Sequence, residues 1–135
     1  MMGVLAGASL VAVADEQAVA YKPFLDCAAS RTDYLYLLKQ SGYDKNDELK
    51  EIEQEVQFYL QVAESLSERS LRNEFLKTAE NEREKTGKMI KTRGSGAYLA
   101  YNSDRKKECA ALVRKHQKEI MKAADKLYGE QEKKG

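Results

Sequence analysis

The chain has 135 residues, a formal net charge of +1, one proline and no tryptophan. This length is typical of a single domain, and such a domain can build its hydrophobic core without a structural metal. A composition rich in Ala, Leu, Glu, Lys and Gln favours helices and argues against a sheet protein.

The amino terminus carries an uncharged apolar run over residues 3–14. The run is too short to anchor a protein across a bilayer, but it fits the core of a secretory signal peptide. Ala12-Val13-Ala14 supplies a small-x-small cleavage site, although no Lys or Arg precedes the run. We therefore expect residues 1–14 to be a signal peptide and the mature chain to be periplasmic or secreted, with no transmembrane segment. The alternative is an apolar first helix packed into the core.

Two helices are predicted next along the chain. Pro23 is well placed in the first turn of the first helix, and Gly42 ends that helix. Apolar residues recur between them at helical spacing: Phe24, Cys27, Ala28, Tyr34, Leu35 and Leu38. After a polar turn, a second apolar stripe runs from Leu49 to Leu66.

The apolar stripe of the second helix shifts by one residue near the serine cluster at residues 65–70. Leu71 opens a new stripe, which continues to Ile90. This shift predicts a break or sharp kink near residues 67–70. One unbroken helix over residues 48–91 is the alternative.

The start of the last helix decides whether the two cysteines can meet. Two cysteines in an exported protein are expected to pair, and Cys27 and Cys109 both lie on apolar stripes. A start near Ala97 places Cys109 beside Cys27 in a simple bundle, whereas a start at Asp104 requires a long crossing connection. We prefer the start near Ala97 and predict a Cys27–Cys109 disulfide. The alternative is a pair of buried thiols in a cytosolic protein.

Short connections between amphipathic helices predict the fold class. We expect an all-α protein, an antiparallel up-down bundle of about four amphipathic helices cross-linked by one disulfide. The bundle would span residues 15–129, with the last helix ending at Gly129. Residues 130–135 would form a flexible tail.

The charges are divided unevenly along the chain. Residues 15–82 have a net charge of −7, and residues 83–135 have a net charge of +8. A basic row lies along the expected last helix: Lys107, Arg114, Lys118, Lys122 and Lys126. This row is a possible partner-binding face for a protein or an anionic surface, or simply solvated helix charge.

No catalytic, metal or nucleotide motif is present. His116 is the only histidine, and it lies on an apolar helix face, where a packing role is favoured over catalysis. No Cys-x-x-Cys pair, Glu-x-x-His pair or phosphate-binding loop occurs, so we expect no metal and no cofactor. The sequence likewise gives no sign of specific nucleic-acid binding.

These observations favour a non-enzymatic interaction or structural protein that acts by surface contacts outside the cytoplasm. The alternative is a helical bundle that binds a small apolar or aromatic ligand with Tyr34, Tyr36 and Tyr59. An enzyme is disfavoured and would have to depend on His116.

Overall fold

The computed structural model describes residues 19–134, with side chains described as far as Leu127. The expected signal peptide, residues 1–14, lies outside the described residues. The described part contains five helices and no strand: α2 (Lys22–Gln40), α3 (Asn46–Ser67), α4 (Arg72–Arg93), α5 (Ser95–Lys115) and α6 (Gln117–Lys134). The predicted all-α class is therefore confirmed, with five helices in place of about four.

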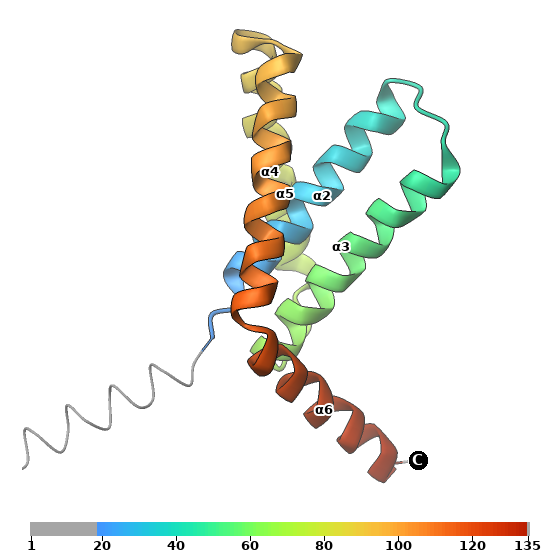
Figure 1. Cartoon of the computed structure of the whole chain (residues 1–135), viewed down its shortest axis with the longest axis vertical. Helices are drawn as coiled ribbons and strands as arrows, with labels where there is room; N and C mark the ends of the chain where they lie inside the picture. The colour runs from blue at the N-terminus through green and yellow to red at the C-terminus, as the bar shows by residue number, and fades with distance from the viewer. Residues whose placement is uncertain (1–18, 135) are drawn as a thin grey trace, which may run out of the picture.

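Helix α2 is the centre of the bundle because it packs against α3, α4 and α5. The α2–α3 hairpin and the α4–α5 hairpin meet at one end of the molecule and diverge toward the other (Figure 1). Helix α6 begins at this shared end and packs against α3. In Figure 1, α6 then projects away from both hairpins.

The ends of α2 lie where the proline and the glycine predicted them. Pro23 occupies the first turn, where its missing N–H leaves no helical hydrogen bond unmade. At the other end, Gly42 has a φ of +81°, which favours glycine and lets the chain reverse. The amide of Tyr43 then donates to the carbonyl of Leu38 and closes the helix end.

The predicted break between the second and third helices is confirmed. Glu68 caps α3 in the left-handed conformation, with a φ of +57°. The amide of Leu71 donates to the Glu64 carboxylate over 2.9 Å, which satisfies an amide next to the start of α4. The alternative of one helix over residues 48–91 is therefore wrong.

Helix α5 begins at Ser95, directly after Gly94, which has a φ of +89°. The preferred start near Ala97 is thus confirmed to within two residues, and the start at Asp104 is wrong. This early start carries Cys109 along α5 to a point opposite Cys27 on α2. The two sulfur atoms are bonded, and the Cα atoms lie 5.9 Å apart.

The prediction of a single last helix is wrong, because the chain changes direction at His116. His116 has φ −110° and ψ 21°, so α5 ends there and α6 begins at Gln117. The change of direction brings α6 onto α3, where Ile120 packs against the core. Helix α6 also continues past Gly129, the expected end, to Lys134.

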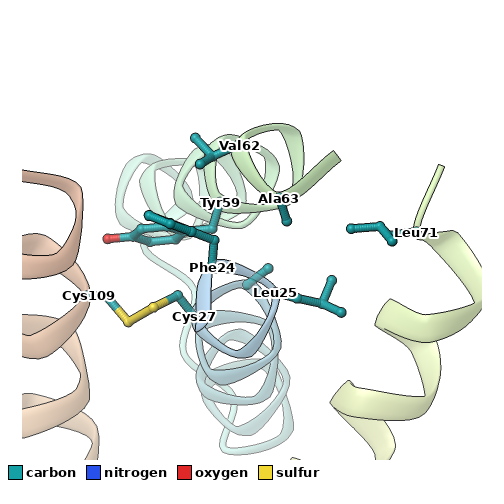
Figure 2. Packing of buried hydrophobic residues seen from close by; sticks show 9 residues of the cluster. Phe24, Leu25, Cys27, Tyr59, Val62, Ala63, Leu71 and Cys109 are labelled. Atoms are coloured by element: carbon teal, nitrogen blue, oxygen red, sulfur yellow. A yellow bond between two sulfur atoms is a disulfide. The ribbon is translucent and has the colours of Figure 1, made fainter. Parts of the chain in front are cut away.

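The hydrophobic core lies where the two hairpins meet. In Figure 2, Phe24 and Leu25 of α2 lie below Tyr59, Val62 and Ala63 of α3, with the disulfide on one side of α2 and Leu71 on the other. The cluster of buried residues is Phe24, Leu25, Cys27, Ala28, Tyr59, Val62, Ala63, Leu71 and Cys109. Leu71 reaches this core from the connection between α3 and α4. The core thus holds both hairpins together at the end from which α6 departs.

None of the helices in the described part of the chain is both long enough and apolar enough to cross a bilayer.

Candidate functional site

A buried arginine joins three helices beside the core. Arg31 lies on the core-facing side of α2 and is only 3% exposed. Its Nη1 donates to Asn102 Oδ1 of α5 over 3.1 Å, and its Nε lies 3.0 Å from Glu55 Oε2 of α3. The guanidinium also stacks on the Tyr34 ring at 5.0 Å. Because these contacts engage the guanidinium, Arg31 fixes helix positions and is not open to a ligand.

A second buried polar pair joins α2 to α4. Asp33 is 1% exposed, and Thr86 Oγ1 lies 2.7 Å from Asp33 Oδ2 and 3.3 Å from the carbonyl of Arg83. The shorter contact is a hydrogen bond that the Thr86 hydroxyl donates to the Asp33 carboxylate. Burial raises the pKa of Asp33, and the nearby Glu82 carboxylate raises it further.

Two tyrosines of α5 lie near the Asp33–Thr86 pair. Burial is the main cause that raises the pKa of Tyr98 and of Tyr101. Tyr101 also donates a hydrogen bond of 2.7 Å to Glu82, which stabilises the protonated phenol. Both tyrosines are therefore neutral at physiological pH and serve as packing and hydrogen-bonding groups.

The three tyrosines of the ligand-binding hypothesis do not converge on one place. Tyr34 faces Tyr98 of α5, with ring centroids 6.5 Å apart. Tyr36 packs under the Arg83 guanidinium of α4 at 3.6 Å, and Tyr59 belongs to the core cluster. Since each ring packs against a different neighbour, they do not line a common cavity.

The other residues considered for catalysis or metal binding make structural contacts. His116 lies at the junction of α5 and α6, and its ring meets the Phe24 ring edge-on at 6.3 Å. Both cysteines are bonded to each other. Within residues 19–134, no group of three His, Cys, Asp or Glu side chains is placed to hold a metal ion.

The predicted basic face is divided between two helices by the break at His116. Lys107 and Arg114 lie on α5, and Lys118, Lys122 and Lys126 lie on α6; all five are exposed. Lys126 donates a hydrogen bond to Glu68 of α3, and this bond lowers the pKa of Glu68. The other four side chains form no ion pair with the described residues.

An open apolar groove between α3 and α6 was not expected from the sequence. It has a volume of about 670 Å³. Its lining includes Phe58, Val62 and Ser65 of α3 and Ile120, Ala124 and Leu127 of α6. Phe58 is 44% exposed and Leu127 is 39% exposed, so the groove presents apolar surface to solvent.

The comparisons with known proteins give no relative: no family model, curated protein or solved structure matches this chain.

Proposed function

We propose that this is an exported, non-enzymatic interaction protein, and that its basic face binds a protein partner with an acidic surface. The basic face consists of Lys107, Arg114, Lys118, Lys122 and Lys126. The observation that carries the proposal is the exposure of all five side chains, four of them without an ion-pair partner among the described residues.

The charge of the surrounding helices supports an acidic partner. Residues 95–127 contain eight basic and four acidic residues, whereas α3 contains six acidic residues and one lysine. A surface with a net positive charge speeds encounter with an acidic surface and disfavours basic partners. The basic face thus offers selectivity between partners without any chemical reaction.

The interior supports a structural rather than a catalytic role for the buried polar groups. Arg31 is held by Glu55 and Asn102, and Asp33 is held by Thr86. A catalytic base or nucleophile must reach its substrate, and Arg31 and Asp33 are buried between helices. The proposal therefore places the function on the surface.

Export is part of the proposal and depends on the apolar run at residues 3–14 and its small-x-small site. The disulfide between Cys27 and Cys109 supports it, because such bonds form and persist in oxidising compartments.

Site-directed photocrosslinking in the native organism tests the proposal. A photoreactive residue at Met121, which is 58% exposed and adjoins Lys118 and Lys122 on α6, should capture a macromolecule in the exported fraction. The double variant Lys118→Glu, Lys122→Glu should abolish this capture, because it reverses the charge of the face. The matched control, Lys77→Glu with Lys91→Glu, makes the same charge change on exposed lysines of α4 and should retain it. Absence of any captured macromolecule, or equal loss in both double variants, would contradict the proposal.

A further inference from the structure

We infer that Asp33 and Thr86 form a pH-sensitive clasp: the α4–α5 hairpin lies against α2 while the Asp33 carboxyl is protonated, and moves away from α2 when this carboxyl ionises. The clasp is independent of the partner proposed above, and it gives the protein two arrangements of its hairpins. Its basis is the position of the Asp33 carboxyl. This side chain is buried where α2 meets α4, and the Thr86 hydroxyl donates to its Oδ2 over 2.7 Å.

The second oxygen of the Asp33 carboxyl is poorly placed for a negative charge. This oxygen, Oδ1, is buried and has no hydrogen-bond partner among the described residues. An ionised carboxylate that is removed from water needs donors for both oxygens, whereas the neutral carboxyl costs much less to bury. The Thr86 hydroxyl supplies a donor for Oδ2 alone. The closed arrangement therefore favours the protonated form of Asp33.

The charged groups of α4 that act on Asp33 do not compensate its ionised form. Burial is the largest cause that raises the pKa of Asp33. The Glu82 carboxylate raises this pKa more than the Arg83 guanidinium lowers it. Arg83 is engaged elsewhere, because it stacks on the Tyr36 ring at 3.6 Å. The negative charge of an ionised Asp33 would thus meet a second negative charge and no direct cationic partner.

The groups of the other neighbouring helices do not supply the missing positive charge. Tyr98 and Tyr101 of α5 lie near Asp33 as neutral phenols; burial raises the pKa of both, and the charge of Asp33 raises it further. The buried cation of α2 itself, Arg31, is paired with the Glu55 carboxylate of α3 over 3.0 Å. Ionisation of Asp33 therefore weakens the closed arrangement, and movement of α4 away from α2 would let water reach the carboxylate.

The disulfide provides the pivot for this movement. Cys27 lies six residues before Asp33, which corresponds to about 9 Å along α2. The bond joins α2 to α5 in both arrangements, so the hairpins stay connected at the end where α6 begins. The hairpins already diverge toward their other ends (Figure 1). Opening the clasp extends this divergence and leaves the core around Phe24 in place.

Double electron–electron resonance tests the clasp on the mature protein. Spin labels on unnatural amino acids at Gln40 and Thr92 leave the disulfide intact and report the distance between the far ends of α2 and α4. From about pH 4 up to the raised pKa of Asp33, the ratio of long to short distances should rise by about tenfold per pH unit. Asp33→Asn is neutral at every pH, so its distance should stay short. Asp44→Asn, an exposed control, should respond like the wild type.

A second pair of labels and a second variant complete the test. Thr92 and Lys107 both lie in the α4–α5 hairpin, so the distance between them should not change with pH. Glu82→Gln removes a charge that raises the pKa of Asp33, so the rise in the ratio should end at a lower pH. Four results would overturn the inference: a Gln40–Thr92 distance that does not respond to pH, the same response in Asp33→Asn, a Thr92–Lys107 distance that changes over the same pH range, or no effect of Glu82→Gln.

Discussion

Reduction of the Cys27–Cys109 disulfide should lower the free energy of unfolding by about 4.5 kcal/mol at 25 °C. The bond joins residues separated by 82 positions. In the chain-entropy model, closing a loop of that length lowers the entropy of the unfolded chain by about 15 cal/mol/K. Small domains are stable by only about 5–15 kcal/mol, so the bond would supply a large share of the total.

Urea titration followed by far-ultraviolet circular dichroism measures this difference on the oxidised and the reduced protein. The two forms share every side chain, so the comparison isolates the cross-link from any cavity effect. The variant Cys27→Ala, Cys109→Ala is the control, because its unfolding curve should not respond to reductant. Equal stability of the oxidised and reduced wild-type protein would show that this bond does not join α2 and α5.

Two further predictions concern the interior. Folding raises the pKa of Asp33. Between about pH 4 and this raised pKa, the folded chain therefore binds more protons than the unfolded chain. The free energy of unfolding should fall as pH rises through that interval. Urea titrations at several pH values should show this slope in wild type and in Asp44→Asn, where the change is exposed, but not in Asp33→Asn. In the same assay, Phe24→Ala should lower the free energy of unfolding by about 3–5 kcal/mol. Phe58→Ala, at an exposed position, should lower it by less than about 1 kcal/mol. Equal decreases in the two variants would contradict the assignment of Phe24 to the core.

The helix boundaries that sequence predicted are those with a local chemical cause. Pro23 favours a helix start, and Gly42 and Gly94 adopt the positive φ angles that end helices. The shift of the apolar stripe near residues 67–70 marked the end of α3 because a continuous helix would have turned its stripe away from the core. The disulfide could be predicted from the start of α5, because this start determines how far along the bundle Cys109 lies.

The break at His116 could not be predicted in this way. No Gly or Pro interrupts the chain there, and the apolar stripe continues through it to Leu127. The change of direction depends on contacts between distant segments, with the His116 ring against Phe24 and Ile120 against the core. The groove was missed for the same reason, because its shape depends on the placement of α6 relative to α3.

The sequence contains a feature that indicates the buried arginine. The apolar stripe of the first predicted helix has a gap between Ala28 and Tyr34. Arg31 lies in that gap, four residues after Cys27 and four before Leu35, on the same helix face. A charged residue at such a position must find a partner in the core, and the structure supplies Glu55 and Asn102.

Intact-mass spectrometry of the protein isolated from its native organism tests most directly the claim that this is an exported, disulfide-bonded bundle. We expect a chain that begins at Asp15 and weighs two hydrogen atoms less than the same chain after reduction. A chain that retains residues 1–14, with a mass that reduction does not change, would contradict it.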